Sequence, residues 1–225
     1  MSTKSRSLQL LLGWLSPSFP VGAYAFSHGL EYAVEHGSVT TPKALQHWIR
    51  VLLTSGSAHA DLVFARHAWR AESTSQIREL AALALAFSPS AEIKLESVAQ
   101  GEAFARATAD AWPSSAVDEL AGLLPDTCPY PIAVARVARH HDVSETALLS
   151  GYAHAFCANL VSAAIRLVPL GQTDGQRVMA GLLDAIENAV DRAMQNEVNA
   201  IASHTLMSDI ASMKHEHQYT RLFRS

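Results

Sequence analysis

The chain has little charge. Asp, Glu, Lys and Arg make up 17% of its 225 residues, whereas about 25% is usual for a soluble domain. Hydrophobic residues account for 49%, which indicates either a large core or apolar surface that a partner covers. The net charge of −4 and the lack of any Lys/Arg run argue against nucleic-acid binding, because neutralising phosphates requires a basic face.

Cysteine pairs and long apolar runs are also missing. Cys128 and Cys157 form no CxxC pair, which predicts two reduced thiols rather than a disulfide framework or a zinc site, with a single disulfide as the alternative. The N-terminal apolar stretch at 8–12 is broken by Gln9 and lacks a signal-peptide cleavage site. We find no segment near the roughly 18–20 apolar residues that span a bilayer, so no membrane contact is expected.

Catalytic motifs are absent as well. The sequence contains no phosphate-binding GxxxxGK[ST] loop, no GxGxxG turn and no GxSxG elbow. Most of the eleven histidines are scattered. The nearest approach to a metal site is His215 with His217, which an extended chain would place on one side. We predict a protein that is not an enzyme and has no cofactor of its own, with transient metal contact by this pair as the alternative.

Helical periodicity is what the sequence does contain. Thr41-Pro42 is a typical helix start, and an apolar stripe follows it at helical spacing: Leu45, Trp48, Ile49, Leu52 and Leu53. Similar start signals are predicted at 88–89, 142–145 and 173–176, the last leading into one long helix that reaches Met194. No strand-like alternation is sustained. We predict an all-α, single-domain bundle over residues 1–225, with about eight to ten helices.

The last eleven residues, His215 to Ser225, hold two histidines, one acid, two aromatics and two arginines. Chain ends are usually frayed unless something ties them down. Tyr, Phe and Arg are the residue types that anchor interfaces. We therefore predict a docking tail over residues 209–225, which lies either on its own domain or on another protein. A disordered end is the alternative.

Two further segments combine apolar and polar residues. In the first, at 16–31, two prolines and a glycine predict a turn and then a helix near Tyr24. We predict a docking segment over residues 1–30, whose binding rim combines aromatic and polar side chains: Phe19, Tyr24 and Phe26 beside Ser27, His28 and Glu31. The alternative is that the aromatics of this segment are core residues. Glu31 needs a partner if it is buried.

The second segment, at 159–177, carries Asn159 and Arg166 about two turns apart on one helix face. An arginine in an apolar helix is either snorkelling or paired. We predict that Arg166 is paired within a subunit interface, with an internal salt bridge as the alternative.

Taken in order, the segments SPSFPVGAYAFSHGLE, NLVSAAIRLVPLGQTDGQ and SMKHEHQYTRLFRS resemble the family of the urease accessory protein UreF, over essentially the whole chain. The resemblance implies an all-α, cytoplasmic homodimer without catalysis of its own. It implies a scaffold that bridges UreD (also called UreH) and the GTPase UreG and acts on apo-urease. Nickel and GTP would then be handled through these partner proteins.

The family's terminal motif is associated with UreD binding, which implies a partner-binding set here: His215, Glu216, Tyr219, Arg221, Leu222, Phe223 and Arg224. A UreG-facing surface near Tyr24, Ser27 and Glu31 is our hypothesis. Some members are proposed to pass nickel through His or Cys near the dimer axis, but Ala202-Ser203-His204 and the cysteines form no evident ligand set here. The alternatives are a nickel metallochaperone using its histidines, and a GTPase-activating protein supplying Arg166 or a tail arginine.

Overall fold

The computed structural model describes residues 3–202 and 205–225, and within these ranges all regular structure is helical. The prediction of an all-α fold is confirmed. The described residues form twelve α-helices and two short 3-10 helices: α1 (Thr3–Trp14), η1 (Ala23–Ala25), α2 (Leu30–Glu35), α3 (Pro42–Ser55), α4 (Ser57–Arg70), α5 (Thr74–Ala86), α6 (Ala91–Ala111), α7 (Ala116–Ala121), α8 (Tyr130–His140), α9 (Glu145–Leu167), α10 (Gln172–Ala180), α11 (Leu183–Gln195), η2 (Val198–Ala200) and α12 (Leu206–His215).

The number of α-helices exceeds the predicted eight to ten for a local reason. Helices α2 and α7 have only six residues each, too short to give a periodic signal. The long helix predicted to reach Met194 is two helices, because α10 ends at Ala180, with Gly181 as its C-cap, and α11 starts at Leu183.

Helix starts follow capping chemistry. The α3 start is confirmed, since the Thr41 side chain accepts a hydrogen bond from the Ala44 N–H at 3.2 Å. The predicted start at 88–89 is wrong by two residues, because the hydroxyl of Ser90 caps α6 by accepting from the Ile93 N–H.

The other two predicted starts are also displaced. Ser144 caps α9, while Asp142 adopts a left-handed φ of 57° outside the helix. Helix α10 is capped at Gly171, whose N–H donates to the Asp174 side chain at 3.3 Å.

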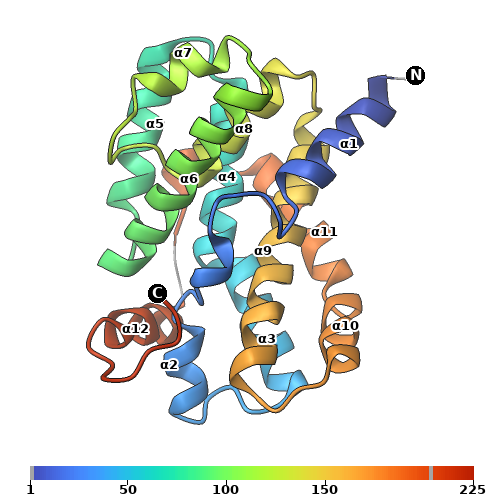
Figure 1. Ribbon diagram of the computed structural model, residues 1–225, viewed down its shortest axis with the longest axis vertical. Helices are drawn as coiled ribbons and strands as arrows, with labels where there is room; N and C mark the ends of the chain where they lie inside the picture. Colours follow the sequence, from blue (N-terminus) through green and yellow to red (C-terminus); the bar gives the residue numbers. More distant parts are fainter. Residues whose placement is uncertain (1–2, 203–204) are drawn as a thin grey trace.

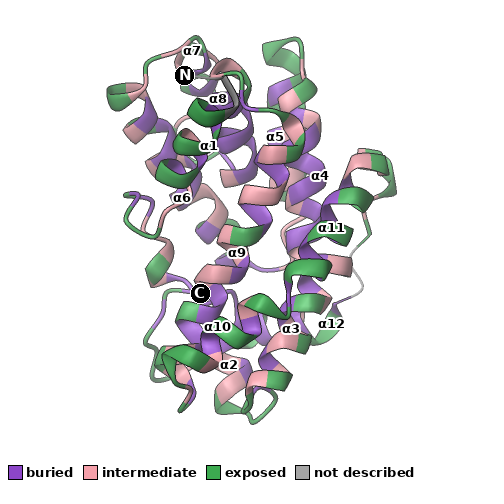
Figure 2. Cartoon of the chain, turned by 90° about the vertical axis from the view of Figure 1, so that its right-hand side faces the viewer, coloured by how far each residue is buried: buried purple, intermediate pink, exposed green. Residues whose placement is uncertain are grey.

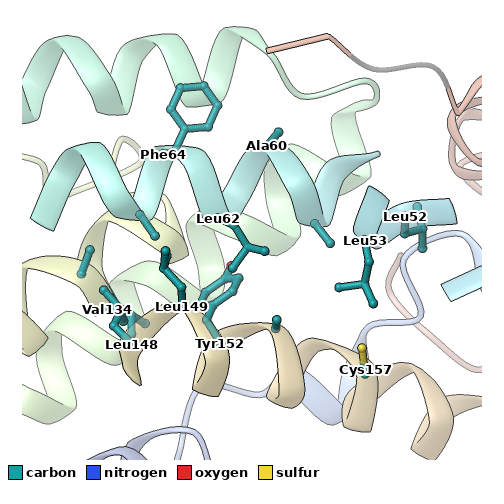
Figure 3. Packing of buried hydrophobic residues seen from close by; sticks show 14 of the residues in the cluster. Leu52, Leu53, Ala60, Leu62, Phe64, Val134, Leu148, Leu149, Tyr152 and Cys157 are labelled. Carbon is teal, nitrogen blue, oxygen red and sulfur yellow. The ribbon is translucent and has the colours of Figure 1, made fainter. Parts of the chain in front are cut away.

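Helices α4 and α9 lie at the centre of the molecule (Figure 1), with α3, α10 and α11 packed toward one end and α5 to α8 toward the other. One apolar cluster runs through these helices. Leu62 of α4 meets Leu149 and Tyr152 of α9 in its middle (Figure 3). Buried residues accordingly face inward on each helix, and exposed ones line the outer turns (Figure 2).

Helix α9 is longer and more apolar than the sequence analysis allowed. Its 23 residues pass the length and hydropathy test for a membrane span, contrary to the expectation that no segment would. Half of its most apolar stretch is buried against the rest of the chain, and α9 contacts α3, α4, α10 and α11. Its position as a central helix accounts for that composition. It also carries Cys157, which is a free, buried thiol, as is Cys128; burial raises the pKa of both to about 12.

The segment that follows α1 lies against the C-terminal residues of the chain. After α1 the chain makes only one 3-10 turn at Tyr24, so the helix predicted there is wrong and α2 starts at Leu30. A β-carbon at Gly29 would lie 2.8 Å from the Ser212 backbone nitrogen of α12. This glycine, with a left-handed φ of 75°, therefore permits α12 to approach α2 closely. The C-terminus then returns beside η1 and α2 (Figure 1).

Candidate functional site

The C-terminal tail lies on its own domain, and the Glu31 carboxylate is the main anchor. Oε1 accepts from the Leu222 N–H at 2.7 Å, and Oε2 accepts from the Phe223 N–H at 3.0 Å. Glu31 is buried, so it has the partners that a buried acid needs. We name this contact region the tail junction: Glu31, Glu92 and Glu96 on the domain side, and His215, Arg221, Phe223 and Ser225 on the tail side.

His215 lies between two carboxylates and is fully buried. Its Nε2 is 3.0 Å from Glu31 Oε2, and its Nδ1 is 2.6 Å from Glu92 Oε2. Each ring nitrogen of the imidazole therefore contacts a different carboxylate. Arg221 Nη1 donates to the other Glu92 oxygen at 2.8 Å. Two acids therefore face two basic side chains across the tail junction.

The end of the tail is held by backbone and aromatic contacts. The Ser225 carbonyl accepts from the Ser27 N–H at 2.7 Å and from the Ser27 hydroxyl. The Ser225 hydroxyl donates to Glu96 at 2.6 Å. The Arg166 guanidinium lies 4.2 Å from the centroid of the Phe223 ring, which is a cation–π contact. The tail is thus tied to α2, α6 and α9 together.

The structure gathers many of the predicted partner-binding residues here, but with unequal exposure. Ser27, Glu31, His215 and Phe223 are buried. Tyr219 and Leu222 project outward, at 103% and 69% exposure.

The remaining tail residues also contact the domain. Glu216 accepts from the Ala91 N–H at 3.0 Å, the Arg224 N–H donates to the Ala25 carbonyl at 2.8 Å, and the Arg224 guanidinium lies 5.6 Å from the Phe26 ring. That these residues bind a partner stays a prediction. Arg166 meets an aromatic ring rather than an acid, which disfavours the internal salt bridge.

A cavity of about 780 Å³ adjoins the tail junction. Its walls come from α1, the loop after it, α6 and α9, and they include Leu8, Leu11, Leu12 and Leu15 of α1. Two predicted site residues, Tyr24 and Asn159, line it without joining the tail junction. Polar side chains also line it, among them His28, Asp61, Glu96 and Tyr152, and we name the space the Asp61 cavity.

Burial and neighbouring charges shift the pKa values of Asp61 and His28 in this cavity. Burial raises the pKa of Asp61 from its ordinary 3.8 to about 6, although the Tyr152 hydroxyl, which donates to it at 2.8 Å, acts in the opposite direction. Burial alone would lower the pKa of His28, but Glu96 at 3.3 Å, with Asp61 and Asp209 farther away, raises it overall. The second ring nitrogen of His28 lies 2.6 Å from the Ser57 hydroxyl.

Sequence reasoning missed Asp61, Glu92 and Glu96. Glu92 and Glu96 are one turn apart on α6, a spacing that is equally common on solvent-facing helices, so only the contacts identify them. Asp61 had no local signal at all.

We expect Asp61→Asn to stabilise the protein at neutral pH. The folded state holds the Asp61 proton more tightly than the unfolded state, so stability falls as pH rises from about 4 to about 6, and the full penalty applies above that. The penalty is at most about 3 kcal/mol, since one pKa unit corresponds to about 1.4 kcal/mol, and water in the cavity lessens it. Urea unfolding at pH 7.5 and pH 4.5 measures it.

The matched control for this prediction is Asp118→Asn, at an exposed acid on α7. Its effect should be small and independent of pH. A gain in stability from Asp61→Asn that is equally large at both pH values would contradict the assignment.

Metal binding by the two tail histidines finds no geometric support. His215 is buried at the end of α12, whereas His217 is exposed, so the extended conformation required for a shared ligand pair is not adopted. In residues 3–202 and 205–225 no group of three or more His, Cys, Asp or Glu side chains could hold a metal ion. The Ser203-His204 part of the other considered ligand set lies outside the described residues.

The described fold is all-helical, and its C-terminal tail docks on its own domain. Comparison with known proteins identifies the family. The sequence model of the family described as UreF matches residues 39–183. The chain is 47% identical to the urease accessory protein UreF of Rhodopseudomonas palustris (strain BisB5), covering 99% of this chain and 93% of that protein. For UreF of Bradyrhizobium sp. (strain ORS 278) the identity is 45%, covering 97% and 92%.

A third relative, UreF of Granulibacter bethesdensis (strain ATCC BAA-1260 / CGDNIH1), is 43% identical over 100% of this chain and 96% of its own length. The chain belongs to the UreF family of urease accessory proteins. All three relatives are named urease accessory proteins.

Proposed function

We propose that the chain is a cytoplasmic, homodimeric, non-catalytic scaffold in urease maturation, which bridges UreD and the GTPase UreG and thereby couples GTP hydrolysis to nickel insertion into apo-urease. Nickel and GTP are handled by the partners, and the scaffold needs no cofactor. It biases the GTPase cycle by binding one nucleotide state of UreG more tightly than the other.

The single observation that carries this proposal is the exposed part of an otherwise anchored tail. Buried contacts of Glu31, His215 and Phe223 hold the segment in one conformation. Two large side chains, Tyr219 and Leu222, are left pointing outward. A rigid loop that presents an aromatic and an aliphatic side chain is suited to a protein interface, because little conformational entropy is lost on binding.

We expect the double substitution Tyr219→Ala/Leu222→Ala to weaken UreD binding at least about tenfold while the fold is retained, since truncated interface anchors commonly cost more than 1 kcal/mol each. Both side chains are exposed, so folding should not depend on them. Co-purification with UreD and a titration by calorimetry measure the change.

The control is Leu183→Ala, at a similarly exposed leucine on α11, which should leave UreD binding unchanged. Deleting the tail would be a poorer test, because it also removes the buried Phe223 and Ser225. Wild-type affinity of the double variant for UreD would rule out the tail as the UreD-binding element.

A further inference from the structure

The Asp61 cavity combines apolar walls with a carboxylate that no basic side chain of the described residues contacts directly; His28 acts on it only through longer-range electrostatics. Tyr152 donates to Asp61 Oδ2, and no other hydrogen bond within the described residues reaches this side chain. No Lys, Arg or His of the described residues forms an ion pair with it. A carboxylate at the wall of an apolar space is costly unless a cation approaches it. The Asp61 carboxylate is therefore suited to bind a positively charged group.

The neighbouring polar groups do not supply that charge by contact. Glu96 is already engaged with His28, Gln100 and Ser225. His28 is held by Glu96 on one side and by Ser57 on the other. Asp209, the third acid that lines the cavity, accepts a hydrogen bond from the Thr205 hydroxyl at 3.2 Å. Asp61 accepts only from the Tyr152 hydroxyl among the described residues, so its carboxylate is the one available to a ligand.

The shape of the cavity favours a long apolar stem behind the charge. Its volume of about 780 Å³ falls within the usual range for ligand pockets, roughly 300–1,000 Å³. Leucines of α1 and Phe64 of α4 line it. Lysine and arginine side chains have this construction, with methylene groups that pack on apolar surface and a charged end.

The exposed apolar residues at the mouth of the Asp61 cavity indicate that the apolar stem of the ligand belongs to a polypeptide. Leu8, Leu12 and Tyr24 line the cavity and are also among the most exposed large hydrophobic side chains, at 57%, 66% and 69%. Apolar lining thus continues from the interior onto the surface. A small amine would leave this rim uncovered, whereas an apolar helix would cover it.

We propose that the Asp61 cavity receives a lysine or arginine side chain from an apolar helical segment of a partner polypeptide, with Asp61 as its counter-ion. The inference rests on the proposed function, because an assembly partner of the scaffold supplies the helical segment. It assigns a second contact surface, on the α1 side of the molecule, in addition to the exposed tail residues.

The charge requirement is tested with small probes on the isotope-labelled full chain. Titrations followed by NMR compare n-hexylammonium, 1-hexanol and hexanoate at pH 7.5. We expect n-hexylammonium to bind about tenfold or more tightly than 1-hexanol, with hexanoate weakest. In Asp61→Asn the ammonium and the alcohol should bind within about threefold of each other, whereas Asp118→Asn should retain the wild-type preference. Equal binding of the two probes by the wild type, or an unchanged preference in Asp61→Asn, would overturn the proposal.

The polypeptide source is tested with two leucine-rich helical peptides, each about four turns long, identical except for a central Lys or norleucine. We expect the Lys peptide to bind at least about tenfold more tightly than both n-hexylammonium and the norleucine peptide, and to lose this advantage in Leu12→Gln. Binding of the free amine without the Lys peptide would assign the cavity to a small amine and overturn the polypeptide occupant. None of these probes involves UreD, so their failure is distinct from a failure of the tail to bind UreD.

Discussion

Substitution of Glu31 by Ala is expected to release the tail. The change removes the acceptor for the Leu222 and Phe223 amides and one of the two carboxylates that face His215. A buried group left without its partner costs about 1–3 kcal/mol. Docking weakened by about 3 kcal/mol should accelerate hydrogen exchange of these two amides about a hundredfold. Exchange measured by NMR tests this.

Glu35→Ala is the matched control, because Glu35 lies one turn further along α2 and also accepts a hydrogen bond from the tail, through Gln218. That contact is exposed, so its loss should change exchange at Leu222 and Phe223 only a fewfold. Equal acceleration in the two variants would show that Glu31 is not the anchor.

Glu31→Ala also distinguishes two roles for Glu31: holding the tail in position and contacting UreD directly. Glu31 is buried, so a partner cannot rest on it directly in the docked state. If the tail must be held in place to present Tyr219 and Leu222, Glu31→Ala should still weaken UreD binding, about tenfold. Unchanged affinity would mean that UreD captures a released tail.

The sequence predicted those properties of the fold that depend on neighbouring residues. The apolar stripe from Leu45 to Leu53 and the Thr41 cap are local patterns, and α3 forms as they indicate. Where two caps compete a few residues apart, as at Ser88 and Ser90, local pattern does not decide between them. The difference lies in tertiary contacts, because the Ser90 hydroxyl also meets Ser212 of α12 at 2.5 Å.

The candidate site could be predicted only in pieces. The residue types of the tail and of segment 16–31 marked each one separately as a docking element. Their joining could not be read from the chain, because Glu31 and His215 are 184 positions apart and no local period links such positions. Asp61 was missed for the same reason: its setting is made by α1, α6 and α9, which meet it only in the folded protein.

Gly101→Ala is expected to have the largest effect on stability. Gly101 lies in α6, and a β-carbon there would be 2.0 Å from the Cys128 carbonyl oxygen and 2.8 Å from the Pro129 carbonyl carbon. Both are backbone atoms, so α6 and the start of α8 must separate. Overpacking of this kind costs about 3 kcal/mol or more, which for this chain length lowers Tm by roughly 6–12 °C. Thermal unfolding followed by circular dichroism measures it.

Gly13→Ala is the control, since a β-carbon at Gly13 in α1 meets no atom within 4 Å. Alanine there should stabilise the helix by up to about 1 kcal/mol, so the two glycine variants should change Tm in opposite directions. Helix α6 also carries Glu92 and Glu96. A displaced α6 should therefore loosen the tail, and faster exchange of the Phe223 amide in Gly101→Ala but not in Gly13→Ala would show that packing of α6 on α8 sets the position of both acids. Unaltered exchange, despite a lowered Tm, would show instead that the tail junction tolerates movement of the helix that carries them.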